Sequence, residues 1–183
     1  FKNSFDQSFL IQESQIEKEV VKKTEVENGL IVDFQDYEIV INFNPWNFAI
    51  KKNGQIVTQE VSEDIFLGGD FITYPLGYFN DNQVISQCTY ALEYHIQECI
   101  YGFGEKFNSL EKSGQTIRIW NQDARTVCTE KAYKNIPFFM STRGYGFLLT
   151  NSQPSIFHIA SKSTRSIGIE IENNSFEYWM ILG

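Results

Sequence analysis

Residues 100–151, IYGFGEKFNSLEKSGQTIRIWNQDARTVCTEKAYKNIPFFMSTRGYGFLLTN, decide the fold of this chain. Runs of β-branched and aromatic residues recur from residue 115 of this stretch to the end of the sequence. Such runs, bounded by turn residues, are typical of short strands. They lie at residues 115–120, 137–141, 145–150, 155–160, 166–171 and 176–182. Short strands at this spacing predict an all-β protein built as a two-sheet antiparallel sandwich.

The same pattern extends toward the N-terminus. Two dipeptides, Gln35-Asp36 and Asn53-Gly54, each separate a pair of strand-like runs. Asn-Gly is the strongest short signal for a hairpin turn, because both residues tolerate the left-handed backbone that such a turn needs. The segment around these dipeptides is therefore predicted to be a meander of hairpins.

Three other segments read differently. Residues 84–100 are predicted to be a nearly continuous strand that includes His95, whereas residues 64–82, with Gly68-Gly69 and Pro75, read as a long loop. Residues 13–23 are compatible with either a helix or a strand, and the sequence leaves both open.

Composition narrows the class of protein. The 183 residues are 42% hydrophobic and 15% aromatic, which predicts one domain, residues 1–183, with a packed core. A formal charge of −8 repels phosphates and anionic membrane surfaces, so neither nucleic acid nor membrane is an expected partner. Three cysteines, an odd number without metal-ligand spacing, and the lack of a secretion signal favour reduced thiols and a cytoplasmic location.

Four peptides occur here in an order that resembles glycoside hydrolase family 31, and within it the bacterial α-xylosidases. They are Tyr101-Gly102-Phe103-Gly104-Glu105-Lys106-Phe107, Trp120-Asn121-Gln122-Asp123, Ala132-Tyr133-Lys134-Asn135-Ile136-Pro137-Phe138 and Arg143-Gly144-Tyr145-Gly146. The resemblance implies a galactose-mutarotase-like sandwich (supersandwich) at the N-terminal side of a catalytic (β/α)8 barrel that would follow residue 183. The third of the four peptides is the one that is similar to α-xylosidases.

Further expectations follow from the resemblance. Family 31 enzymes are retaining, and both of their catalytic aspartates lie on the barrel, so no catalytic residue is expected in this chain and the chain alone should be inactive. The expected substrate is an α-linked oligosaccharide or xyloside. An α-glucosidase of the same family, an independent carbohydrate-binding module and a purely structural module are the alternatives, and a homo-oligomer is left open.

Asp123 is the main candidate for substrate binding. In the family, an Asn-Arg-Asp type of tripeptide lies in a loop over the barrel mouth and its aspartate contacts sugar hydroxyls; here Gln122 replaces the arginine. A carboxylate offers two acceptor oxygens for such hydroxyls. The alternative role is a turn aspartate that bonds its own backbone. Trp120 is a second candidate because an indole can stack on a pyranose, while Phe138 is expected to pack in the core.

The remaining polar candidates favour structural roles. Glu105 is expected to form an ion pair or to accept backbone hydrogen bonds, and Lys134 and Arg143 are expected to pair with local carboxylates or to hold the domain against the barrel. His95 and His158 lie 63 positions apart and have no metal-ligand motif around them, so neither a metal site nor a cofactor is expected.

Overall fold

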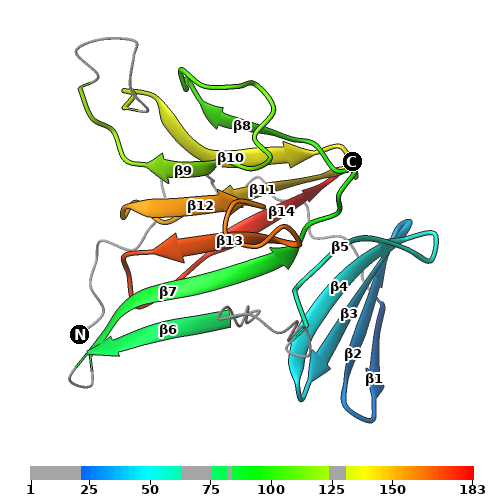
Figure 1. The fold of residues 1–183 in the computed structure, drawn as a ribbon. Coiled ribbons are helices and arrows are strands. Elements are labelled where there is room, and N and C mark those ends of the chain that lie inside the picture. The colour runs from blue at the N-terminus through cyan, green and yellow to red at the C-terminus, as the bar shows by residue number, and fades with distance from the viewer. Residues whose placement is uncertain (1–21, 63–75, 82–83, 124–130) are drawn as a thin grey trace, which may run out of the picture.

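A computed structural model describes residues 22–62, 76–81, 84–123 and 131–183. These residues form fourteen strands and no helix. The strands are arranged in three antiparallel sheets, of five, four and five strands (Figure 1). In particular, no helix of the described ranges is long and apolar enough to cross a membrane.

The first sheet is a simple meander. Its strands follow chain order: β1 (Lys22–Val26), β2 (Gly29–Phe34), β3 (Tyr37–Phe43), β4 (Trp46–Lys52) and β5 (Gln55–Gln59). Phe34 pairs with Tyr37 across the first predicted turn, and Lys52 pairs with Gln55 across the second. Asn53 and Gly54 have φ of 50° and 77°, the left-handed values that a two-residue hairpin requires. Both predicted hairpins are confirmed.

The other two sheets pack face to face. The four-stranded sheet has the order β14–β11–β10–β8 and the five-stranded sheet the order β6–β7–β13–β12–β9. The strands are β6 (Leu76–Asp81), β7 (Val84–Glu93), β8 (Ile100–Gly104), β9 (Thr116–Ile119), β10 (Asn135–Ser141), β11 (Tyr145–Leu149), β12 (Ser155–Ile159), β13 (Ser166–Ile171) and β14 (Tyr178–Leu182). All six strands predicted in the C-terminal third are present.

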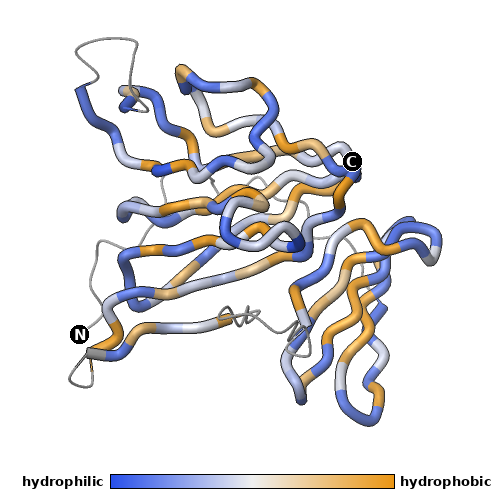
Figure 2. The backbone as a smooth tube through the Cα atoms, in the orientation of Figure 1, coloured by the Kyte–Doolittle hydropathy of each residue, from blue (hydrophilic) through white to orange (hydrophobic). Residues whose placement is uncertain are grey.

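Aromatic rings fill the space between these two sheets. Phe139 and Phe147 are cross-strand neighbours whose rings stack with centroids 5.5 Å apart, and Phe157 from the facing sheet meets both rings edge-on. The meander adds Phe48 and Ile50 to the same core. Hydropathy along the chain alternates accordingly within many strands (Figure 2). The predicted all-β antiparallel sandwich is confirmed, with the N-terminal meander as a third sheet.

Two expectations about the middle of the chain were wrong. Strand β7 ends at Glu93, and the chain then turns to enter β8 in the other sheet, so His95 is exposed in a turn and is not a strand residue. Buried Glu98 holds this turn, because it accepts hydrogen bonds from Ser141 Oγ at 2.5 Å, Tyr145 Oη at 2.8 Å and the His95 backbone N–H at 3.2 Å.

The second wrong expectation was the long loop predicted at residues 64–82. Its last part forms β6, which pairs with β7 from Leu76 to Asp81, while residues 63–75 lie outside the described ranges. Of the ambiguous segment 13–23, only Lys22 and Lys23 are described, and they belong to β1.

Cys88 and Cys99 are free thiols that belong to different layers. Cys88 lies in β7 of the five-stranded sheet, and Cys99 directly precedes β8 of the four-stranded sheet. Cys128 lies outside the described residues.

Candidate functional site

The two peptides that carry the candidate residues meet at one place, where the segment after β9 lies against the segment before β10. Asn121 forms a parallel bridge with Ala132, and the Gln122 backbone N–H donates to the Ala132 carbonyl at 3.1 Å. Residues 120–123 and 131–135 are described, and the residues between them are not. The two described segments form the candidate site.

Asn135 fastens these segments together. Its side-chain amide donates to the backbone carbonyls of Trp120 at 3.0 Å and Ala132 at 2.7 Å, and to Asn121 Oδ1 at 2.9 Å. The Asn135 backbone N–H donates to the same Asn121 oxygen at 3.1 Å. Because Asn135 is the first residue of β10, the segment after β9 is anchored to a rigid strand.

Asp123 is held by a tyrosine from the other segment. Tyr133 Oη donates to Asp123 Oδ1 at 2.5 Å. This hydrogen bond to the carboxylate, with the nearby negative charge, raises the pKa of the Tyr133 phenol. The phenol therefore stays protonated and continues to orient the carboxylate.

Strand β8 approaches the site so closely that one of its residues must be glycine. A Cβ on Gly104 would lie 2.1 Å from the Lys134 carbonyl oxygen, and the Gly104 φ is +76°. The next residue, Glu105, donates its backbone N–H to that carbonyl at 3.0 Å, and its side chain pairs with Lys134 Nζ at 3.1 Å. The expected structural ion pair of Glu105 and the expected carboxylate partner of Lys134 are both present.

Three side chains of the candidate site are exposed to solvent. Trp120 is 44% exposed and Tyr133 is 64% exposed, and Asp123 is exposed as well. Together they offer an indole face, a phenol and a carboxylate to solvent. This set can stack on an apolar ring face and accept hydrogen bonds from hydroxyl groups, which are the contacts that a sugar provides.

Other predicted residues lie elsewhere. Arg143 does not pair with a carboxylate in the described part of the chain; it donates to the backbone carbonyls of Ile56 at 2.5 Å and Val57 at 2.9 Å, and so links the sandwich to β5. Phe138 was expected in the core, but it is only half-buried and lies on the other face of β10 from Phe139. Two adjacent strand residues point to opposite faces, and Phe139 takes the core position.

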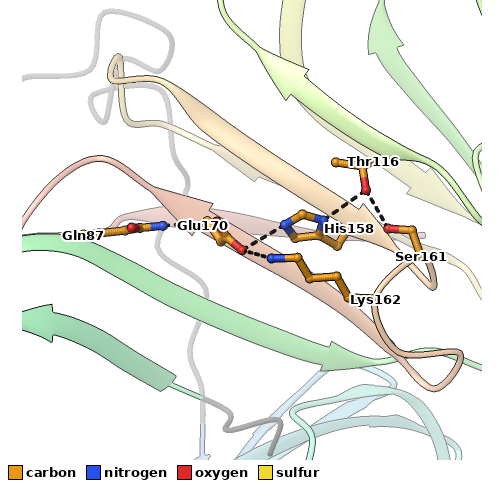
Figure 3. Close-up of polar contacts among 6 residues, drawn as sticks. All are labelled: Gln87, Thr116, His158, Ser161, Lys162 and Glu170. Carbon is orange, nitrogen blue, oxygen red and sulfur yellow. Dashed lines mark hydrogen bonds and ion pairs between the residues drawn. The ribbon is translucent and has the colours of Figure 1, made fainter. Parts of the chain in front are cut away.

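His158 belongs to a polar network on the five-stranded sheet (Figure 3). Its Nε2 lies 2.9 Å from Glu170 Oε1, and its Nδ1 lies 3.1 Å from Thr116 Oγ1. Lys162 Nζ donates to the same Glu170 oxygen at 2.5 Å, and Gln87 Nε2 donates to the other at 3.2 Å.

The surroundings of this network set its protonation. Burial lowers the pKa of His158, and the charge of Lys162 adds to this effect. Burial alone would raise the pKa of Glu170, but Lys162 and His158 outweigh it and lower that pKa. In the resulting state, a neutral imidazole donates through Nε2 to an ionised carboxylate. Across the described ranges, no group of three His, Cys, Asp or Glu side chains could hold a metal ion.

Sequence reasoning missed Tyr133 and Asn135 as parts of the site. Both lie in the peptide that carries the α-xylosidase likeness, which was the available signal. Neither spacing nor composition indicated that this peptide folds against residues 120–123.

The comparisons with known proteins agree on one family. Residues 2–158 match the model for the glycosyl hydrolase 31 N-terminal galactose mutarotase-like domain. The chain is 35% identical over 131 residues to the α-xylosidase XylQ of Lactiplantibacillus pentosus, which covers 72% of the chain and 16% of XylQ. It is 29% identical over 154 residues to an α-xylosidase of Emericella nidulans, which covers 81% of the chain and 20% of that protein.

A solved structure has the same fold. The GH31 dextranase of Flavobacterium johnsoniae superposes with a TM-score of 0.80 at 24% identity, over 97% of this chain and 21% of the dextranase. The chain thus spans only about a fifth or less of the proteins that it resembles.

Proposed function

The chain belongs to glycosyl hydrolase family 31, and from that premise we propose that it is the N-terminal domain of a retaining α-xylosidase. The observation that carries the proposal is the 35% identity to an α-xylosidase over 72% of the chain, and a second relative of the same name matches 81% of it. Its substrate is an α-linked xyloside or oligosaccharide.

Catalysis in this proposal belongs to a barrel domain outside the chain. Retaining hydrolysis needs two carboxyl groups about 5–5.5 Å apart across the scissile bond. The two described segments of the candidate site contain one carboxylate, that of Asp123. The domain supplies a rigid wall for the substrate, and the chain alone is inactive.

Asp123 and Trp120 are the substrate-binding residues of the proposal. The Asp123 carboxylate accepts hydrogen bonds from sugar hydroxyls beside the scissile bond, and the Tyr133 hydroxyl fixes its orientation. The exposed indole of Trp120 stacks on the apolar face of a sugar ring. Asn135 holds both residues by tying their segment to β10, so the binding groups do not have to be ordered when the substrate arrives.

Two other functions are weaker. An α-glucosidase would use the same domain, because the sugar in the cleavage subsite is chosen by residues outside this chain. An independent carbohydrate-binding module would present its aromatics mainly at the surface, whereas Phe139, Phe147, Phe157 and other aromatics of this chain fill the core. We place the enzyme in the cytoplasm, a location supported by the free thiols of Cys88 and Cys99.

The test uses the intact enzyme that contains this chain. A sugar hydroxyl that loses a charged acceptor costs about 1.5–3 kcal/mol, which corresponds to roughly a 10- to 150-fold loss of kcat/KM. Asp123→Ala should therefore lower kcat/KM on p-nitrophenyl α-xyloside by about that factor, with the far-UV spectrum and melting temperature nearly unchanged. Tyr133→Phe should lower it by a smaller factor, because the carboxylate remains but is no longer oriented.

Glu105→Gln is the matched control, since it removes an exposed carboxylate that pairs with Lys134 near the same site. It should leave kcat/KM within about twofold, as is usual for an exposed ion pair. Wild-type kcat/KM in Asp123→Ala would return Asp123 to a turn-forming role. Faster turnover of p-nitrophenyl α-glucoside than of the xyloside by the wild type would favour the α-glucosidase.

A further inference from the structure

The four-stranded sheet has an apolar face on the side away from the core. One cross-strand row contains Tyr101, Met140 and Ile181, with Gly146 between the last two. The next row contains Phe138, Leu148 and Trp179. Because strand side chains alternate between faces, these residues point away from Phe139 and Phe147, which fill the core. We call the six side chains the outer apolar face.

This face is exposed in the chain. Met140 is 53% exposed and Ile181 is 49% exposed, and Phe138, Leu148 and Trp179 are half-buried. The Phe138 Cε2 atom lies 3.0 Å from the position that a Gly146 Cβ would occupy, so the Phe138 ring fills the gap that the glycine leaves. Neither row contains a charged side chain. Contiguous apolar surface of this kind is normally covered by another surface.

We propose that the outer apolar face is the docking surface for the catalytic part of the same polypeptide, an inference that rests on the proposed function. The matching relatives are long enough to supply such a partner, since this chain corresponds to only 16% and 20% of the two α-xylosidases. Strand β10 carries Phe138 and Met140 and begins at Asn135, which anchors the Trp120 segment. The outer apolar face and the candidate site therefore share strand β10.

A second copy of the chain fits the face less well. Each copy carries a formal charge of −8, so two copies repel each other, and an uncharged face offers no ion pairs that would offset this. A catalytic domain joined through the backbone binds at a high effective concentration and needs little additional affinity.

The two methionines of the chain provide the test. Met140 lies on the outer apolar face, and Met180 lies on the inner face of the same sheet, packed against the core. The intact enzyme is treated with hydrogen peroxide beside N-acetylmethionine amide, and sulfoxide formation at each methionine is followed by peptide mass spectrometry. A covered side chain reacts only when its cover opens, so Met140 should react at least about tenfold more slowly than the amide. Reaction within about threefold of the amide overturns the proposal.

Three variations identify the cover. If Met140 stays protected on dilution and after deletion of residues 1–21, the catalytic domain is the cover. If protection is lost on dilution, a second copy of the chain is the cover; if it is lost on deletion, the N-terminal segment is. Either loss overturns the proposal. Ile181→Lys should speed oxidation of Met140 by about tenfold, because the lysine charge must leave an apolar contact. Ser86→Lys, at an exposed position of β7, is the matched control and should not change it.

The oxidation rates do not depend on turnover. An enzyme that fails on α-xylosides but protects Met140 would contradict the proposed substrate and leave the docking surface standing. An active α-xylosidase with a freely oxidised Met140 would contradict the docking surface alone. If Ile181→Lys does not fold, the wild-type rates still decide.

Discussion

The two outer faces of the sandwich differ in the polarity of their side chains. The five-stranded sheet carries the network of Gln87, Thr116, His158 and Glu170, in which each side chain has a hydrogen-bond partner (Figure 3). The four-stranded sheet carries only uncharged and mostly apolar side chains in its two central rows. Both sheets share one aromatic core, so the difference lies entirely in the residues that face away from it.

This difference in polarity indicates what each face needs in order to be stable. A polar face that satisfies its own hydrogen bonds is stable in contact with water. An apolar face of a sheet stabilises the protein only when it is covered, by roughly 25 cal/mol for each Å² of apolar surface removed from water. The hydrogen bonds of the polar network on the five-stranded sheet are therefore satisfied within this chain, whereas the outer apolar face of the four-stranded sheet is stabilised by a partner.

The largest expected effect tests which face of β10 is the core. Phe139 is fully buried and stacks on Phe147, so Phe139→Ala should destabilise the chain by about 3–5 kcal/mol. Phe138→Ala, one residue away on the outer apolar face, should cost about 1 kcal/mol in the chain alone, because its side chain is already partly in water. Urea unfolding of the two variants measures both values.

The Phe138→Ala and Phe139→Ala variants can also be compared in the intact enzyme. There the cost of Phe138→Ala should rise toward that of Phe139→Ala, since a covering partner would make both rings buried. Equal costs in the chain alone would mean that the assignment of the two faces is wrong.

A matched pair of glycines gives the next effect. Gly104→Ala places a Cβ 2.1 Å from the Lys134 carbonyl oxygen at a φ of +76°, so it should cost at least about 2 kcal/mol and separate β8 from the site. Gly168→Ala, in the middle of the polar face, places a Cβ 3.7 Å from the nearest atom, which is ordinary contact. It should be neutral or stabilise by up to about 1 kcal/mol, because alanine restricts the unfolded chain. Thermal unfolding compares them, and similar losses would contradict the close approach at β8.

Much of the fold could be predicted from local chemistry. Asn53-Gly54 specifies its own turn, and the strands after residue 115 have regular spacing. The failures came from long-range pairing. Gly68-Gly69 and Pro75 indicated a loop, but residues 76–81 gain a strand partner in β7 that no local signal shows. Which of Phe138 and Phe139 faces the core depends on the pairing of β10 with β11, which alternation leaves ambiguous where two aromatics are adjacent.

The candidate site shows the same limit. The peptides around Asp123 and Tyr133 are separate in the sequence, and each carries part of the family likeness. Their contact depends on Asn135, which bonds three acceptors on both segments at once. Such a clamp is a property of the folded backbone and leaves no periodic pattern in the sequence.

The smallest expected effect is the response of the polar face to acid. The pKa of His158 is lowered from 6.5 by burial, so below pH 6.5 the unfolded chain binds a proton that the folded chain does not, and stability falls with falling pH. The pKa of Glu170 is lowered from 4.5, so its contribution is present above that value and is lost as the pH falls through the folded pKa. Both groups act in the same direction, so the stability of the chain should fall as the pH is lowered from 7.5 to 4. Urea unfolding across this range measures the slope, and His158→Gln should flatten its upper part.

His95→Gln removes the other imidazole of the chain, which is exposed beyond β7. If both variants flatten the slope equally, the acid response does not arise from the His158–Glu170 network.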